Sequence, residues 1–138
     1  APQTGRDVFS PVESTAKDPS EGIRHDAGKP RYDLLPPDAL EELARVYTRG
    51  AEKYADRNWE KGMNWGRHFA ALMRHAWAFW RGDEADPETG LHPMAHAAWS
   101  CLALVAYSKR RIGTDDRPGS AARRNPGLGV PLWPERVP

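Results

Sequence analysis

Two histidines four residues apart, His92 and His96 in the stretch "DPETGLHPMAH", have a type and spacing that could do chemistry. On a helix, side chains at this spacing project from the same side, so both imidazoles could share a metal ion or a phosphate group. The unpaired N–H groups at the start of a helix also favour an anion. Asp86 and Glu88 in the preceding turn could add the hard oxygen ligands that Mg²⁺ and Mn²⁺ prefer. The alternative is that "DPETG" is a capped acidic turn, which explains Asp86 without any ligand.

A second candidate group lies in "GAEKYADRNWEKG", residues 50–62, where carboxylates, cations and rings occur close together. A nucleotide site needs carboxylates to hold a metal, cations to hold phosphates and an aromatic ring to stack on a base. Glu52 and Asp56, one turn apart, could supply the carboxylates. The candidate donors and rings are Lys53, Arg57, Asn58, Lys61, Tyr54, Trp59 and Trp65. The alternative is a solvated helix face of mixed charge, with the members Glu42, Arg45, Arg49, Glu52 and Asp56.

Lys29 and Arg31 flank a proline in a third candidate segment, "HDAGKPRYDLLP". They could clamp phosphate over the helices, or they could belong to a basic linker that enters the first helix. The pair His25–Asp26 is literally an "HD", but it lies in an irregular segment rather than on a helix, which disfavours a metal phosphohydrolase of the HD type. The sequence also lacks a GxxxxGK[ST] loop, a GxSxG elbow and an HExxH motif.

Three helices are predicted to position these groups. Apolar residues that recur every three or four positions predict one helix over about 38–55 and a second from Asn64, a candidate N-cap, to about residue 80. A third begins near His92, where Pro93 suits a first-turn position, and continues to about residue 111. Because no strand pattern of any length appears, the expected fold is all-α, a small helical bundle of three to four main helices.

The apolar faces of these helices indicate how they pack. The third helix is apolar around nearly its whole circumference and should be the central one, and the second has so wide an apolar face that it should be largely buried. His75 borders that face and could be a core histidine or a site residue. Cys101 has no partner cysteine and is expected to be a buried small hydrophobe. We expect a flexible arm over 1–25, an all-α domain over 26–112 and a Pro/Gly-rich tail over 113–138. Both terminal segments are expected to be irregular.

Composition excludes several classes of partner. With 20 basic and 19 acidic residues the formal net charge is +1, so the chain has no bulk field for a stable nucleic acid complex or an acidic membrane. Six tryptophans indicate flat surfaces that pack a small core or stack on a ring-shaped ligand. The beginning of the chain lacks the regions of a signal peptide, and no apolar run approaches the roughly 18 residues of a membrane span. We therefore expect a cytoplasmic protein.

Four segments in succession resemble one family. They are "DAGKPRYDLLPPDAL", "RGAEKYADRNWEKGM", "AALMRHAWAFWRGDEADPETGL" and "MAHAAWSCLALVAY", and together they span about residues 26–108. This succession resembles the phage-encoded dATP/dGTP diphosphohydrolases, relatives or analogues of the MazG-like all-α nucleoside triphosphate pyrophosphohydrolases. The resemblance implies hydrolysis of purine deoxynucleoside triphosphates, dATP or dGTP, to the monophosphate and pyrophosphate. It also implies dependence on Mg²⁺, Mn²⁺ or another divalent ion, and a role in adjusting the phage nucleotide pool in the host cytoplasm.

The resemblance also implies roles for individual residues. The MazG-like pattern has two acidic helices that face each other, and in this sequence a histidine replaces the second acidic motif. Pro93 also stands where the family tends to place the earlier histidine. Both departures favour His96 over His92 as the site residue. The implied catalytic residues are Glu52, Asp56, His75 and His96. The implied substrate-binding residues are Lys29 and Arg31 of "GKPR", Lys53, Tyr54, Arg57, Asn58 and Trp59 of "KYxxRNW", and Arg74. The implied metal ligands are Glu42, Glu52, Asp56, Asp86, Glu88 and His96.

Apolar helix faces that a single short chain cannot cover predict a homo-oligomer, a dimer or a tetramer. Three other functions stay open from the sequence. They are a nucleotide-binding regulator without turnover, an HD-like dNTP phosphohydrolase, and a structural helical protein whose tryptophans form interfaces.

Overall fold

The computed structural model describes residues 20–120, and within this range every regular element is a helix, which confirms the all-α prediction. The described elements, in order, are the 3₁₀ helix η1 (Tyr32–Leu34), α1 (Pro37–Lys53), the 3₁₀ helix η2 (Asn58–Lys61), α2 (Trp65–Trp80) and α3 (Pro93–Arg110). Most of the predicted N-terminal arm and of the predicted tail lies outside the described residues. No helix between residues 20 and 120 has the length and hydropathy needed to cross a membrane.

The chain divides into two compact units between Leu35 and Pro36. The described part of the first unit is short and contains η1. Within it, Arg31 pairs with Asp33, with 2.6 Å between Nη2 and Oδ2. The three main helices all belong to the second unit.

The three main helices begin and end within about two residues of the predicted positions, because local signals mark their ends. Two prolines open α1, and Pro37 occupies its first position, where a missing N–H costs no hydrogen bond. His92 is the N-cap of α3, and its Nδ1 accepts a hydrogen bond of 3.0 Å from the N–H of Met94. His92 therefore starts the helix ahead of Pro93, as predicted.

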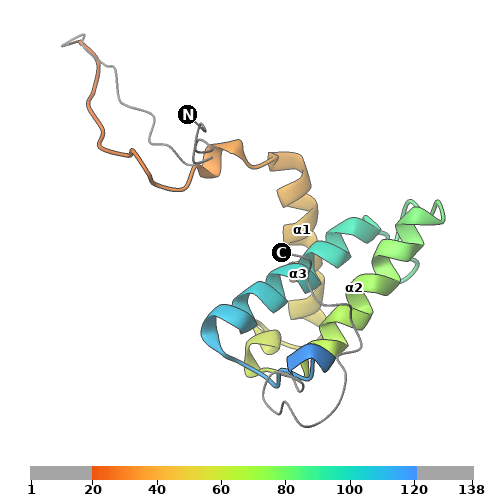
Figure 1. Cartoon of the computed structure of the whole chain (residues 1–138). Coiled ribbons are helices and arrows are strands. Elements are labelled where there is room, and N and C mark those ends of the chain that lie inside the picture. Colours follow the sequence, from red (N-terminus) through yellow and green to blue (C-terminus); the bar gives the residue numbers. More distant parts are fainter. Residues whose placement is uncertain (1–19, 121–138) are drawn as a thin grey trace, which may run out of the picture. The chain divides into compact units, whose positions relative to one another are not determined.

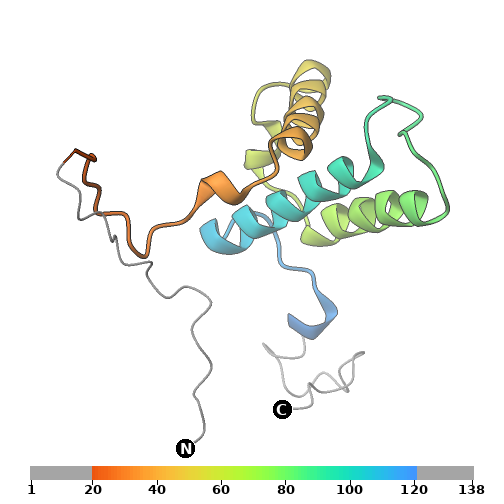
Figure 2. The same ribbon diagram turned by 90° about the horizontal axis from the view of Figure 1, so that it is seen from above.

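Helix α3 lies between the other two, and it runs antiparallel to α2 (Figures 1 and 2). It supplies most of the fully buried positions, and many of these are small side chains, which let the helices approach closely. Its buried residues are Pro93, Ala95, Ala97, Ser100, Ala103 and Tyr107. Only Val46 of α1 and His68 of α2 are equally buried within their helices. The prediction that the third helix is central is thus confirmed.

Two burial predictions are wrong for the chain described here. Helix α2 is not largely buried, because α3 covers only one side of its wide apolar face. Phe69, Trp77 and Trp80 are 56%, 57% and 77% exposed. Cys101 is exposed as well, since it lies on a face of α3 that neither α1 nor α2 covers.

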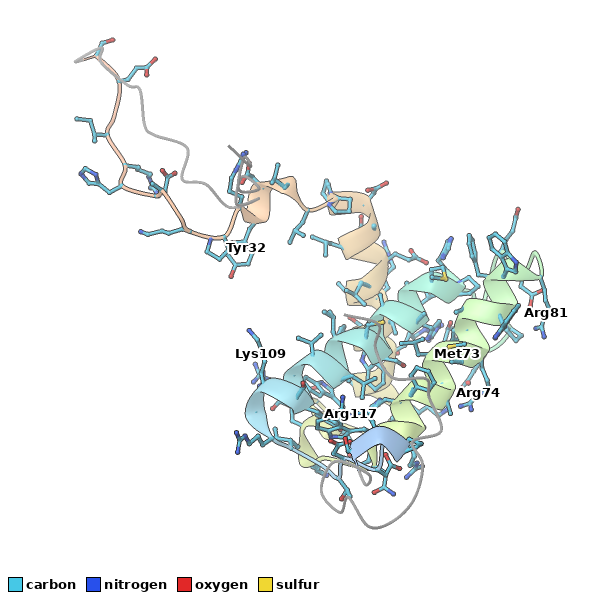
Figure 3. The ribbon with its side chains drawn as sticks, viewed as in Figure 1. Tyr32, Met73, Arg74, Arg81, Lys109 and Arg117 are labelled. Atoms are coloured by element: carbon cyan, nitrogen blue, oxygen red, sulfur yellow. The ribbon has the colours of Figure 1, made fainter. Side chains whose placement is uncertain are left out.

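The segment that follows α3 closes the start of α2. The backbone N–H of Trp65 donates to the carbonyl of Thr114 at 3.0 Å, and the N–H of Gly66 donates to Oδ1 of Asp116 at 2.8 Å. The guanidinium of Arg117 lies 4.9 Å from the centre of the Trp65 ring, where the two segments meet (Figure 3). Asn64 occupies the predicted N-cap position, but its side chain makes no capping bond. Asp116, fifty residues after Gly66, supplies the side-chain cap instead.

Candidate active site

The turn of residues 86–91, between α2 and α3, is built around Asp86. The N–H of Asp86 donates to the carbonyl of Leu91 at 2.8 Å. Its Oδ2 accepts hydrogen bonds from the N–H groups of Glu88 and Thr89 at 3.1 and 3.0 Å. Asp86 therefore caps the acidic turn, which is the alternative that the sequence left open for it.

Two histidines lie beside this carboxylate. The rings of His75 in α2 and His96 in α3 are stacked, with centres 4.7 Å apart and planes 19° from parallel. His75 Nδ1 is 3.9 Å from Oδ1 of Asp86, and His96 Nε2 is 3.8 Å from Oδ2. The hydroxyl of Thr89 is closer still to His96, at 2.7 Å from Nε2. The fold thus brings together three predicted site residues, His75, Asp86 and His96, from two helices and a turn.

The environment sets the charge of this cluster. Burial alone would raise the pKa of Asp86, but the N–H and hydroxyl of Thr89, together with His96, lower it below its usual value. Burial lowers the pKa of His75, and His96 lowers it further, although Asp86 acts in the opposite direction. Near neutral pH the cluster therefore contains a carboxylate anion and a predominantly neutral His75.

An open groove of about 410 Å³ lies between α1 and the turn 86–91. Its lining residues are Arg45, Thr48, Arg49 and Glu52 of α1 and Thr89 and Leu91 of the turn. Both arginines have exposed glutamate partners: Arg45 Nη2 is 2.9 Å from Oε1 of Glu41, and Arg49 Nη1 is 3.6 Å from Oε2 of Glu52. The mixed-charge face predicted for the first helix thus forms one wall of a groove.

Two carboxylates predicted as metal ligands have structural contacts in the turn region. Oε1 of Glu42 accepts the N–H of His92 at 2.9 Å and so caps α3 from α1. Oε1 of Glu88 lies 2.7 Å from Nζ of Lys53, which ties the turn 86–91 to the end of α1. Glu42 and Glu88 therefore hold elements together, and Lys53 faces a carboxylate.

The remaining residues of the "KYxxRNW" segment follow α1 rather than continue it. Asp56 lies in the turn beyond the helix, so it does not extend the helical face of Glu52. Arg57 adopts a left-handed backbone conformation, with φ of 56°, and Asn58 begins η2. The half-buried ring of Trp59 packs on Tyr107 of α3, with centres 6.1 Å apart, and does not line the groove.

Tyr54 is the exposed ring of this segment, 65% accessible, and its centre lies 5.4 Å from Nζ of Lys53. Arg74 is exposed on α2 (Figure 3). Lys29 and Arg31 belong to the other compact unit. Of the predicted substrate-binding residues, Lys53 and Tyr54 thus lie at the end of the helix that forms the groove.

The predicted metal ligands do not converge on one point. Within residues 20–120, no group of three or more His, Cys, Asp or Glu side chains is arranged to hold a metal ion. Among the six predicted ligands, only Glu52 lines the groove. A protein cage made of all six is therefore absent from the described structure.

Sequence reasoning missed Thr89, Arg45 and Arg49 as site residues. The two arginines are one helical turn apart on the face of Glu52, and this mixed-charge spacing is also typical of a solvated helix face. Thr89 carried no signal, because its position depends on the closure of the turn by Asp86 and on the approach of His96 from α3.

Fold and site together define a helical protein with a groove in which arginines, hydroxyls and a carboxylate line a space suited to a phosphorylated ligand. The chain belongs to the dATP/dGTP diphosphohydrolase N-terminal family, whose model matches residues 19–117. It is also similar to a dATP/dGTP diphosphohydrolase of Salmonella phage PMBT28, at 39% identity over 101 residues. That match covers 73% of this chain and 34% of the relative, so the chain spans about a third of the relative's length. No solved structure matched the chain. The family predicted from the four sequence segments is confirmed.

Proposed function

We propose that this protein hydrolyses purine deoxynucleoside triphosphates, dATP and dGTP, to the monophosphate and pyrophosphate. The name of its family and of its phage relative supports this reaction. The structural observation that carries the proposal is the groove, where Arg45, Arg49 and Glu52 of one helix face Thr89 of the turn 86–91. In a phage-infected cell, such an activity in the host cytoplasm would adjust the purine nucleotide pool.

The arginines of the groove fit the triphosphate of such a substrate. Guanidinium groups bind phosphate oxygens through paired, charge-assisted hydrogen bonds. The glutamate partners of Arg45 and Arg49 are exposed on the surface, and exposed ion pairs contribute less than about 1 kcal/mol. A triphosphate, with several negative charges, can therefore displace the carboxylates from both arginines. Tyr54, exposed at the end of α1, is the ring that we assign to the base.

Glu52 is the carboxylate that would hold Mg²⁺, or Mn²⁺, in the groove. Magnesium commonly binds one or two carboxylates and takes its other oxygens from substrate phosphates and water. Such binding needs no cluster of three protein ligands. When bound, the ion would neutralise charge on the phosphates and activate water for the attack.

Glu52 must also leave Arg49 for this role, and their separation of 3.6 Å is a loose pairing. Arg49 is then free to hold the phosphates that become pyrophosphate, where stabilising developing negative charge lowers the barrier. Separation of Glu52 from Arg49 would therefore free the carboxylate to bind the metal ion and the guanidinium to bind the phosphates.

We further propose that the protein is a homo-oligomer, a dimer or a tetramer, in which a second copy covers the exposed face of α2. Phe69, Trp77 and Trp80 are each more than half exposed. Since an aromatic side chain has an area of about 150–250 Å², the three together expose roughly 300–500 Å² of apolar surface. A standard interface buries about 800 Å² per partner. The three rings would therefore form the centre of an interface, and the molecular mass in solution, measured by light scattering, tests this.

Incubation with each dNTP and either Mg²⁺ or Mn²⁺, followed by separation of the products, tests the reaction. Deoxynucleoside monophosphate with pyrophosphate is the expected result. Release of orthophosphate would indicate an HD-like phosphohydrolase, and binding without product would indicate a regulator.

Two matched pairs of variants test the groove. Glu52→Gln should lower kcat about 100-fold or more, whereas Glu84→Gln, an exposed carboxylate in the segment after α2, should not. Arg49→Gln should raise KM about 10-fold or more, since it removes a charged phosphate contact, whereas Arg67→Gln on α2 should leave it unchanged. Equal activity of Glu52→Gln and the unaltered protein would place the reaction elsewhere.

A further inference from the structure

The hydroxyl of Thr89 lies at the centre of a hydrogen-bond network that the proposed reaction does not explain. It donates to Oδ2 of Asp86 at 3.1 Å and accepts the N–H of Leu91 at 3.2 Å. Its third contact, 2.7 Å long, is with Nε2 of His96. Thr89 and Leu91 also line the groove, so this network lies directly behind one of the groove's walls.

The number of hydrogens determines what His96 does in this network. A hydroxyl has one proton to donate and two lone pairs to accept with. A carboxylate can only accept, so we assign the hydroxyl proton to Asp86. One lone pair takes the N–H of Leu91, and the other then accepts from His96. This assignment puts the hydrogen of the His96 ring on Nε2. A ring nitrogen that carries a hydrogen has no lone pair for a metal ion or a proton, so the turn occupies Nε2 and only Nδ1 of His96 keeps a lone pair.

We propose that His96 is a positioning residue, which, with Asp86 and the stacked ring of His75, fixes the turn 86–91 as the wall of the groove opposite α1. The side chains of Asp86 and His96 are each only 14% exposed, whereas those of Arg45 and Arg49 in the groove are 59% and 58% exposed. The cluster is thus sheltered behind the turn, and the ligand-facing groups lie in front of it. We call Asp86, Thr89 and His96 the turn latch.

The turn latch acts on the groove because the turn has few other supports. Two carboxylates tie the turn region to α1: Glu88 reaches Lys53 through an exposed ion pair of 2.7 Å, and Glu42 accepts the N–H of His92 just beyond the turn at 2.9 Å. The remaining backbone bonds lie within the turn or at the start of α3. Exposed pairs hold a loop weakly. Loss of the latch should therefore let Thr89 and Leu91 move relative to α1, and displacement of a binding wall by about 1 Å is enough to weaken substrate positioning.

Substitutions at His96 separate a positioning role from catalysis or metal binding. The amide nitrogen of glutamine can lie near the position of Nε2 and donates a hydrogen bond, but it does not titrate and binds metals poorly. We expect His96→Ala to raise KM about 3- to 10-fold with little change in kcat, and His96→Gln to restore KM to within about 2-fold of the unaltered protein. A metal ligand or general acid–base group would instead lose about 100-fold or more in kcat in both variants. That outcome would overturn the proposal.

Substitutions at Thr89 test the same network from its other side. Thr89→Val keeps the shape of the side chain and removes the hydroxyl, so it should behave as His96→Ala does, whereas Thr89→Ser should behave as the unaltered protein. Equal KM values for the valine and serine variants would contradict the latch. Because Thr89→Val changes so little volume, this pair also decides the matter if His96→Ala fails to fold.

The KM and kcat measurements rest on the proposed function. Two other measurements, hydrogen exchange and nitrogen NMR, do not depend on turnover. Hydrogen exchange at the Leu91 amide, which donates to the Thr89 hydroxyl, should be at least about 5-fold faster in His96→Ala and Thr89→Val. Thr48→Val is the control, since it removes a groove hydroxyl that bonds only within α1, to the carbonyl of Ala44. Nitrogen NMR of the full chain should show that Nε2 of His96 is protonated. Unchanged exchange or a bare Nε2 would overturn the latch, whereas failure to hydrolyse any dNTP would overturn only the proposed reaction.

Discussion

Tyr107→Phe is expected to destabilise the helical unit by about 1–3 kcal/mol. Tyr107 is completely buried, and its hydroxyl donates to the carbonyl of Trp59 and lies 3.2 Å from Nε2 of His68. The carbonyl of Trp59 keeps a second partner, the N–H of Gly62 at 3.1 Å. His68, which is only 2% exposed, has no other hydrogen-bond partner for Nε2 within residues 20–120. The cost is thus mainly that of one buried donor left unsatisfied, about 1–3 kcal/mol.

Urea unfolding followed by circular dichroism measures this cost, with the slope of the transition checked for equality between variants. For a unit of this size, each 1 kcal/mol also lowers Tm by roughly 4–8 °C. Tyr32→Phe is the matched control, because Tyr32 is 77% exposed and should change stability by less than about 0.5 kcal/mol. If Tyr107→Phe were as stable as Tyr32→Phe, the hydrogen bond between His68 and Tyr107 would contribute nothing to stability, contrary to this prediction.

Three further predictions concern stability. Burial, and to a smaller extent Arg67, lowers the pKa of His68 below 6.5, so the unfolded chain binds this proton more readily than the folded chain. The contribution of His68 to stability should therefore be complete above pH 6.5 and decrease as the pH falls below it. Urea midpoints measured over this pH range should decrease less steeply in His68→Gln. Asp116→Ala should cost about 1 kcal/mol in the same assay by removing the cap of α2, and Asn64→Ala almost nothing, and the reverse order would contradict the capping assignment. Gly113→Ala should cost more than about 1 kcal/mol, because φ is 74° and a Cβ would lie 2.3 Å from the carbonyl oxygen of Met63. Gly50→Ala is the control: it lies in open space on α1 and should stabilise the protein by about 0.5–1 kcal/mol. A Gly113→Ala variant that melts at the same temperature as the unaltered protein would contradict this prediction.

The extent of each main helix could be predicted from the sequence because its signals are local. Two prolines mark the start of α1, and Pro93 marks the start of α3. Capping could not be predicted in the same way. Asn64 stands where an N-cap should stand, yet Asp116 does the capping, and Glu42 assists the start of α3 from another helix. Both contacts are tertiary, and periodicity in one segment contains no information about a side chain fifty residues away.

The burial of α2 was mispredicted for a related reason. A wide apolar face indicates that Trp77 and Trp80 need cover, but it does not indicate whether the same chain supplies it. In the candidate site, spacing and the preceding acidic turn brought His96 together with Asp86, whereas His75 entered the site only through the family resemblance. Spacing could not identify Thr89, whose hydroxyl completes the cluster of these three residues, because a threonine between a capped turn and a helix has no distinctive pattern.

The cap that Asp116 provides has a consequence for the order in which the chain takes shape during synthesis. A ribosome releases the residues of α2 before those of α3, and both before residue 116. The first turn of α2 must therefore remain without this cap, and Trp65 without its bonds to Ile112 and Thr114, until nearly all of the described helical unit has emerged. The pairing of α2 with α3 joins neighbouring helices and can form early. We therefore expect the amino end of α2, although it is synthesised early, to be the last part of the helical unit to gain its native contacts.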